Sequence, residues 1–246
     1  MARTRRSASA DLGTKDRIVS VTAEHLARLG PRALELRAIC TEIDISPSLM
    51  NYYFKSTEDL IWQAALHSYG EHVSKQAGAL LGAADGRQAV EGWIRQTIEW
   101  TREHPGIAAL IDFPMLAVEG QGGADPEDLT RDLADLSRRN VATLASAVYA
   151  QLTGRPVRPL GVTKVGLLIK TNASFAYWTS IVGFASLGAS MWVAGRRPHS
   201  FLWRAFGFSP DSQIDDVVSE VLARIDADGR QGAGAAELIA VAEGPE

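Results

Sequence analysis

The sequence predicts an all-α protein in two parts: a small N-terminal unit of short helices and a larger helical bundle behind it. Apolar residues recur at helical spacing along almost the whole chain. The first hundred positions hold only two prolines, Pro31 and Pro47, and runs of β-branched residues are short, so strands are not indicated. Charge also divides the chain. Residues 1–63 carry nine Lys and Arg against eight Asp and Glu, whereas the whole chain has 25 against 29.

Composition limits the class of protein. A chain of 246 residues that is 46% hydrophobic can bury one large core or two small ones. A charged fraction of 22% and a mean hydropathy of −0.04 exclude a disordered chain. The one cysteine, Cys40, excludes an intramolecular disulfide and lies on an apolar stripe, so it is expected to be a core residue rather than a thiol sensor.

The first helix is expected to start near Thr14 and to end at Gly30-Pro31. Residues 1–13 before it are predicted to be a basic flexible arm that carries Arg3, Arg5 and Arg6. A second, short helix is indicated by an apolar stripe between Leu36 and Ile43.

The third helix is predicted from its start signal, in which Ser46 is the N-cap and Pro47 the first helical residue. About seven residues follow before a longer helix begins, capped by Ser56 or Thr57. Three short helices in this order fit a helix-turn-helix over residues 14–62. Met50 and Phe54, four residues apart, would hold the third helix to the core.

The exposed side of this third helix is the candidate nucleic-acid interface. An Asn can pair with adenine, while Ser, Tyr and Lys suit phosphate oxygens. Asn51 could equally be an ordinary solvated residue, and Tyr53 an ordinary core residue. The candidate DNA-binding residues are Arg37, Ser46, Pro47, Ser48, Asn51, Tyr52, Tyr53, Lys55 and Thr57.

Residues 15–62 resemble the TetR/AcrR family of bacterial transcriptional regulators. The resemblance rests on Ile18, on Leu29-Gly30, on the stretch from Leu36 to Ser46, and on the run Met50-Asn51-Tyr52-Tyr53-Phe54-Lys55-Ser56-Thr57-Glu58-Asp59-Leu60. It implies that the third helix enters the major groove, that Arg37 can reach a base, and that Tyr53 contacts phosphate. It also implies that the remainder binds a small molecule and dimerises through its last two long helices.

The sequence departs from the family pattern at several of these positions. Leu34-Glu35 replaces the usual Thr pair that opens the second helix, so a cap and a phosphate contact are missing. Asp44 replaces the usual turn glycine, which is tolerable because Asp accepts left-handed backbone better than most residues. Thr57 replaces a Lys and removes one charge toward phosphate. The arm could replace that charge by reaching the minor groove, or it could be an unstructured solubilising tail.

The larger domain is predicted to cover residues 63–228, followed by a mobile tail over 229–246 with a short helix at 235–242. Its expected helices cover 85–104, 107–119, 126–153, 160–185 and 211–227, with a loop at 119–126 and irregular chain at 196–210. The segment 171–195 has no charged residue but holds seven Thr, Ser and Asn, which favours a helix buried on both sides over a membrane span.

Aromatic residues could line a small-molecule site between the helices of the bundle, although each of them is also compatible with ordinary core. The candidate pocket residues are Trp93, Trp100, Phe113, Tyr149, Asn172 and Trp178. The candidate dimer-interface residues are Ile169, Ala176, Ile214, Val217, Val218, Val221, Leu222 and Ile225.

The sequence therefore predicts a cytoplasmic homodimeric repressor that binds a palindromic DNA operator and is released by a small apolar or aromatic effector. No catalytic, metal-binding or cofactor pattern is evident. The alternative is a membrane- or partner-associated helical adaptor that uses the segment 171–195. A helical enzyme acting on an apolar substrate is a further alternative that no group of residues supports.

Overall fold

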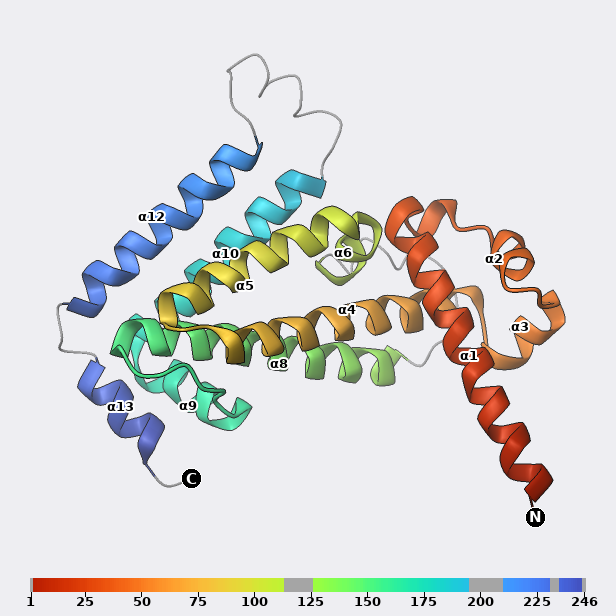
Figure 1. Ribbon diagram of the computed structural model, residues 1–246, viewed down its shortest axis with the longest axis horizontal. Coiled ribbons are helices and arrows are strands. Elements are labelled where there is room, and N and C mark those ends of the chain that lie inside the picture. Colours follow the sequence, from red (N-terminus) through yellow and green to blue (C-terminus); the bar gives the residue numbers. More distant parts are fainter. Residues whose placement is uncertain (1, 113–125, 195–209, 231–234, 245–246) are drawn as a thin grey trace. The chain divides into compact units, whose positions relative to one another are not determined.

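The computed structural model describes residues 2–112, 126–194, 210–230 and 235–244 (Figure 1). Every regular element among these residues is a helix, which confirms the all-α prediction. The chain divides into two compact units. Unit 1 comprises residues 1–71 and 103–135, and unit 2 comprises residues 72–102 and 136–246. The boundary differs from the predicted one at residue 63 because it falls inside a continuous helix, where no break in the sequence pattern marks it.

Unit 1 contains α1 (Ala2–Leu29), the short 3-10 helix η1 (Pro31–Ala33), α2 (Leu36–Glu42) and α3 (Pro47–Tyr53). It also contains the start of α4 (Thr57–Gly82) and α6 (Pro105–Asp112). A small apolar core joins α1, α2, α3 and α4. Its buried members are Ile18, Val19, Ile39, Cys40, Ile43, Met50, Phe54 and Leu60. Met50 and Phe54 therefore hold α3 to the core as predicted, and Cys40 is a buried core residue.

Helix α1 is longer than the sequence predicted, because it begins at Ala2 rather than near Thr14. Residues 2–13 contain no proline and are mostly Ala, Arg, Ser and Leu, which a helix accommodates readily. Gly13 faces open space, since a Cβ added there would meet no atom within 4 Å, and it costs the helix about 1 kcal/mol relative to alanine. The predicted flexible arm is thus the first three turns of a helix.

The turn between α2 and α3 depends on one residue in left-handed backbone, Asp44, with φ of 57°. This matches the expectation that Asp44 replaces a turn glycine. Ser46 then caps α3, because its hydroxyl accepts a hydrogen bond from the backbone N–H of Leu49 at 3.2 Å. Helix α2 has no such cap, since Glu35 at its N-cap makes no side-chain hydrogen bond to the helix. Ser56 caps α4 by accepting from the N–H of Asp59.

Helix α6 packs on the C-terminal end of α1 through two glycines. Gly30 ends α1 with φ of 73°, and its N–H donates to the carbonyl of Leu26. A Cβ on Gly106 would overlap that carbonyl oxygen and approach the Cα of Gly30 to 2.7 Å. Only glycine permits this approach.

Unit 2 is a bundle built from the second half of α4, α5 (Gly86–Glu103) and most of α8 (Pro126–Thr153). It continues with α9 (Val162–Thr171), α10 (Ala173–Ala194), α12 (Pro210–Arg230) and α13 (Ala235–Glu243). All seven of these described helices contribute to one apolar core, in which Tyr149, Phe175 and Leu168 are fully buried. Asp85 caps α5 by accepting from the N–H of Gln88, as the predicted start at residue 85 requires.

The predicted helix over 160–185 is two helices, separated at Asn172. The side-chain oxygen of Asn172 accepts a hydrogen bond from the N–H of Phe175 at 2.9 Å and so begins α10. The backbone N–H of Asn172 donates to Leu168 and so closes α9. An asparagine can end one helix and start the next because its short side chain competes for backbone hydrogen bonds.

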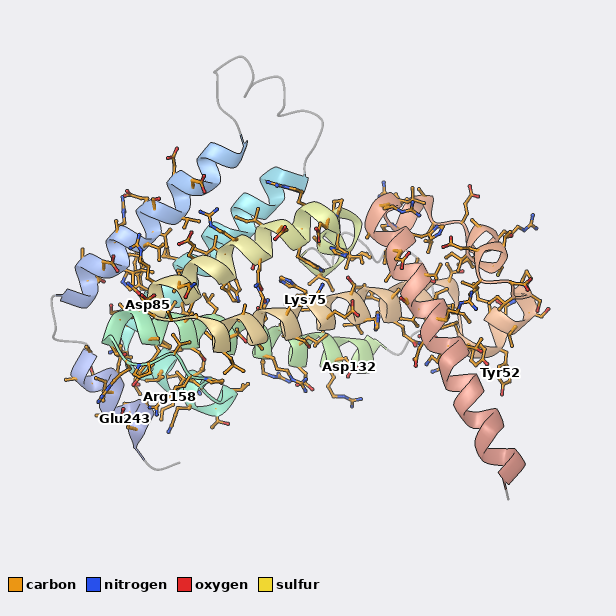
Figure 2. All side chains as sticks on the ribbon, in the orientation of Figure 1. Tyr52, Lys75, Asp85, Asp132, Arg158 and Glu243 are labelled. Atoms are coloured by element: carbon orange, nitrogen blue, oxygen red, sulfur yellow. The ribbon has the colours of Figure 1, made fainter. Side chains whose placement is uncertain are left out.

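The C-terminal segment is not the mobile tail that the sequence predicted, because α13 packs into the core of unit 2. Leu238 is 2% exposed and Ala242 is also buried. Glu243 forms ion pairs with Arg155 and Arg158, each at 3.5 Å (Arg158 and Glu243 are labelled in Figure 2). The short Ala- and Glu-rich segment resembled a tail because it shows too few apolar positions to indicate a buried face.

Several predictions concern residues outside those described: the end of the helix over 107–119, the loop at 119–126 up to residue 125, and the irregular segment 196–210 up to residue 209. No described helix, α10 included, has both the length and the hydropathy of a membrane span.

Candidate nucleic-acid interface and bundle interior

Helix α3 presents a solvent-exposed face on the outside of unit 1. Pro47, Ser48, Asn51 and Tyr52 are all exposed, as the sequence predicted. Tyr52 is 74% exposed and projects outward from α3 (Figure 2). The opposite side of α3 is fixed by Met50, which is 3% exposed. The result is a two-turn helix held from behind with small and polar side chains in front.

Three further candidates lie at the end of α3 and just after it. Tyr53 is half-buried against the core of unit 1, and its ring lies edge-on to Tyr52 with ring centres 5.2 Å apart. Its ring therefore contacts the core, and a contact of Tyr53 with phosphate stays a prediction. Lys55 and Thr57 are exposed. The backbone N–H of Lys55 donates to the carboxylate of Asp59 at 3.0 Å, which fixes the chain between α3 and α4.

Helix α2 contributes Arg37, which is exposed on its first turn. The hydroxyl of Thr41 donates to the carbonyl of Arg37 at 2.9 Å. At the other end of α2, Glu42 lies 2.7 Å from Nε2 of His25 on α1. His25 is 8% exposed. This contact joins α2 to α1, and it pairs the carboxylate of Glu42 with the imidazole of His25.

The helical state of residues 2–13 changes what the N-terminal arginines can do. An α-helix with its side chains is about 10–12 Å wide, whereas the minor groove is about 6 Å wide. Residues 2–13 are the start of α1, so an extended arm is not the form this segment takes, and a contact of the arginines with DNA stays a prediction.

The candidate pocket residues of unit 2 are mostly used by the protein itself. Trp93 donates from Nε1 to Asn140 at 3.2 Å, and Trp178 donates to Asp228 at 2.6 Å. The ring of Trp100 stacks on His72 with ring centres 4.7 Å apart. Asn172 caps α10, and its amide nitrogen lies 3.5 Å from Glu237. Phe113 lies outside the described residues.

Tyr149 differs from the other pocket candidates. Its side chain is fully buried, yet its hydroxyl has no hydrogen-bond partner. Among the described residues, three further buried atoms have no hydrogen-bond partner, and the sequence did not single out their residues: the amide oxygens of Gln76 and Gln96 and the hydroxyl of Thr179. Thr179 was counted only as a polar residue of the uncharged segment, and nothing in the sequence distinguishes it from threonines whose hydroxyl bonds to their own helix.

The predicted dimer stripe on α12 is covered within a single chain. Val218, Val221, Leu222 and Ile225 are at most 8% exposed and belong to the core of unit 2. A side chain that is already buried within one chain has no surface left to contact a second chain. These four residues are therefore core residues and not the dimer contacts that the sequence predicted. Ile169 and Ala176 are half-buried, and the side chains of Ile214 and Val217 are outside those described.

Other large apolar side chains of unit 2 remain exposed. Val162 and Leu167 on α9 and Tyr177 on α10 are 43%, 49% and 54% exposed. They lie on the two helices between which Asn172 forms the break.

Among the described residues, no three His, Cys, Asp or Glu side chains come together to hold a metal ion. Arg95 on α5 donates to Glu91 and Asp215, and these hydrogen bonds raise the pKa of its guanidinium. The 2.7 Å contact with Asp215 joins α5 to α12, so this charge has a structural role.

Comparison with known proteins identifies the fold. No protein-family model and no curated protein sequence matches the chain. Among solved structures, the transcriptional regulator FadR from Bacillus subtilis, in complex with stearoyl-CoA, matches with a TM-score of 0.52 and 10% identity. The match covers 84% of this chain and 96% of that one. SCO4313, described as a regulatory protein, matches with a TM-score of 0.53 and 17% identity over 87% of this chain and 98% of that one. Both of these structures are of regulatory proteins, and the chain has their fold over most of its length.

Proposed function

We propose that this protein is a dimeric transcriptional regulator that binds a palindromic DNA operator through α3 and leaves it when unit 2 binds a small molecule. The observation that carries the proposal is the exposed face of α3, whose rear is fixed by Met50 and whose first turn is capped by Ser46. A helix that reads the major groove must be supported in this way from behind.

The roles of the exposed residues follow from their chemistry. Asn51 is the candidate for bidentate pairing with adenine, and Arg37 for pairing with guanine. Lys55, Thr57, Ser48 and the hydroxyl of Tyr52 are suited to phosphate oxygens, which set the register of the helix on the duplex without reading sequence.

Dimerisation is proposed to use the exposed side of α9 and α10. Helix α10 has no charged residue in its 22 positions, and one of its sides packs into the core through Phe175, Trp178 and Val182. An apolar helix needs neighbours on both sides. On the other side of this pair of helices, Tyr177 of α10 and Leu167 of α9 are exposed to solvent. A second copy related by a two-fold axis would cover them. To bind a palindrome, such a dimer needs its two α3 helices about 34–36 Å apart, one turn of DNA.

The small-molecule response is proposed as a shift between two forms of the dimer. In one form the spacing of the two α3 helices fits the operator, and in the other it does not. A ligand that binds more tightly to the second form lowers the affinity of the dimer for the operator. The size of this effect is set by the difference between the ligand's affinities for the two forms. Helix α4 runs without a break from unit 1 into unit 2 and is the proposed connection. The FadR neighbour holds stearoyl-CoA, whose stearoyl chain is apolar, and this supports a ligand with an apolar part for this chain as well.

Selection of bound fragments from random duplex DNA tests the proposal. The purified dimer should enrich an inverted repeat, and Asn51→Ala should lose the preference at one base of each half-site, with a loss in affinity of about 1–3 kcal/mol. Lys75→Ala changes an exposed residue of α4 in unit 2 and should leave the motif unchanged. If Asn51→Ala selects the same motif as the unaltered protein, α3 is not the reading helix.

A further inference from the structure

Lys15 of the supporting helix α1 lies at the end of α3. Its ammonium nitrogen Nζ is 5.7 Å from the centre of the Phe54 ring, a distance at which a cation and an aromatic face attract each other. Phe54 is 5% exposed, and its backbone N–H donates to the carbonyl of Met50 at 3.1 Å and so closes α3. Helix α1 therefore places a positive charge beside the C-terminal end of α3.

The charge of Lys15 is not neutralised by a described carboxylate. Lys15 forms no ion pair with any residue that the structure describes, and its charged group is held by the Phe54 ring. Asp59, the buried acid at the start of α4, uses its carboxylate to accept from the N–H of Lys55 at 3.0 Å and from the amide of Gln63 at 2.7 Å. An ammonium has three donors, and a ring face covers only one side of it, so Lys15 can still bind a further anion.

A row of aromatic rings joins Lys15 to the exposed face of α3. The ring centres of Phe54 and Tyr53 are 6.4 Å apart, and those of Tyr53 and Tyr52 are 5.2 Å apart. Tyr52 is 74% exposed and belongs to the face that is proposed to enter the major groove. Lys15 therefore lies at the border of this face.

A second lysine stands at the same end of α3. Lys55 follows Phe54 directly and is exposed, and the hydrogen bond from its N–H to Asp59 fixes its backbone. The C-terminal end of a helix carries a partial negative charge, which repels phosphate unless cations offset it. Lys15 and Lys55 supply two such cations from two separate segments of the chain.

We propose that Lys15 binds a phosphate of the DNA backbone, together with Lys55, at the C-terminal end of α3. The partner is phosphate rather than a base, because Lys15 is held over Phe54 at the end of the helix and not on the face that would enter the groove. The inference rests on the proposed DNA binding through α3 and adds a contact from α1. The same helix supports α3 through the core residue Ile18, so a phosphate bound to Lys15 also fixes the position of α3 on the duplex.

The salt dependence of DNA binding tests the inference. The probe is a fluorescein-labelled duplex of unrelated sequence, and fluorescence anisotropy gives the affinity of the full-length protein at a series of KCl concentrations. Lys15→Gln should weaken binding about three- to tenfold at low salt and reduce the slope of log affinity against log salt by about 0.9 for each bound protomer. Lys15→Arg keeps the charge and should keep the slope.

Arg17→Gln is the matched control. It removes one positive charge from an exposed position of the same helix. Two residues further along an α-helix, position 17 lies on the other side of α1 from position 15, so this variant should leave the slope unchanged. Equal reductions of the slope in Lys15→Gln and Arg17→Gln would show that net charge is responsible rather than a contact, and would overturn the inference.

Lys15→Met separates a phosphate contact from support of the fold. The methionine side chain can still pack on Phe54, but it carries no charge. Lys15→Met should reduce the slope as much as Lys15→Gln does, while its melting temperature stays that of the unaltered protein. If both variants keep the full slope and Lys15→Gln only lowers the melting temperature, Lys15 supports the fold alone and the inference is wrong.

The outcome is separable from that of the proposed function. If the unaltered protein selects an operator and Lys15→Gln keeps the full slope, the phosphate contact is wrong and the regulator proposal stands. If the protein binds the unrelated duplex with a slope that depends on Lys15 but selects no motif, the phosphate contact stands and the operator proposal fails. Absence of any DNA binding would contradict both.

Discussion

The indole nitrogen of Trp178 donates a hydrogen bond to the carboxylate of Asp228 at 2.6 Å, and this contact joins α10 to α12. Ser174, one turn earlier on α10, lies 3.4 Å from the same carboxylate. Trp178 itself is 4% exposed, so its N–H would otherwise be buried without a partner. A residue that looked like a ligand contact is thus a fixed link between α10 and α12.

Removing this link should destabilise unit 2. Asp228→Ala leaves the N–H of Trp178 without its acceptor and should lower the free energy of unfolding by about 1–2 kcal/mol. Urea unfolding followed by tryptophan fluorescence measures the change. Asp216→Ala, on an exposed position of the same helix, should change stability by less than about 0.5 kcal/mol. Equal effects of the two variants would contradict a specific role for Asp228.

The contact between α1 and α6 predicts opposite effects for two glycine substitutions. Gly106→Ala places a methyl group against the carbonyl of Leu26 and the Cα of Gly30, and it should cost about 1–3 kcal/mol. Gly78→Ala in α4 meets no atom within 4 Å and should stabilise the protein by about 0.5–1 kcal/mol. Thermal unfolding of both variants checks the signs. A Gly106→Ala protein as stable as the unaltered chain would mean that α6 does not approach α1 so closely.

The turn before α3 predicts a ranking at Asp44. Its φ of 57° is free of strain for glycine, tolerated by aspartate and unfavourable for alanine by about 1 kcal/mol. Asp44→Gly should therefore be at least as stable as the unaltered protein, and Asp44→Ala less stable. Chemical denaturation gives the order, and an Asp44→Ala variant more stable than Asp44→Gly would be inconsistent with left-handed backbone here.

The proposed dimer surface predicts different consequences for two exposed tyrosines. Tyr177→Arg places a charge in the apolar face of α10 and should convert the dimer to a monomer at micromolar concentration, because an unpaired charge in an interface core is costly. Tyr52→Arg, on the exposed face of α3, should leave the dimer intact. Sedimentation velocity distinguishes them. Dimers in both variants would exclude this face of α10 as the interface.

A phosphate contact by Lys55 predicts a change in salt dependence rather than in sequence preference. Lys55→Gln should weaken operator and unrelated duplexes by similar factors and reduce the slope of log affinity against log salt by about 0.9. Lys75→Gln, in unit 2, should leave the slope unchanged. A selective loss for the operator alone would instead assign Lys55 to base reading.

Local signals were reliable where a short stretch of sequence sets the geometry. The Ser46-Pro47 start, the left-handed Asp44 and the buried pair Met50 and Phe54 were all predicted and are all present. Each of them depends on contacts within a few residues or on the intrinsic backbone preference of one residue. The α3 face could therefore be predicted down to the exposed residues.

The predictions of the dimer interface and of the C-terminal tail were wrong, because both depend on which distant segment of the chain covers an apolar surface. The stripe containing Val218, Leu222 and Ile225 indicated a buried face, but its periodicity could not say whether a second copy or the same chain covers it. Leu238 and Ala242 of α13 are buried in the same core although their segment looked like a tail.

The sequence by itself determined that the protein is all-α, that a helix-turn-helix lies near its N-terminus, and which residues of α3 face solvent. Those features follow from periodicity, caps and single-residue backbone preferences, which are local. The tertiary structure alone decided which apolar faces are already covered and which buried polar atoms lack partners. Thr179 makes no hydrogen bond to its own helix, whereas Thr143 does, although both are buried helical threonines, so no local pattern predicts the difference.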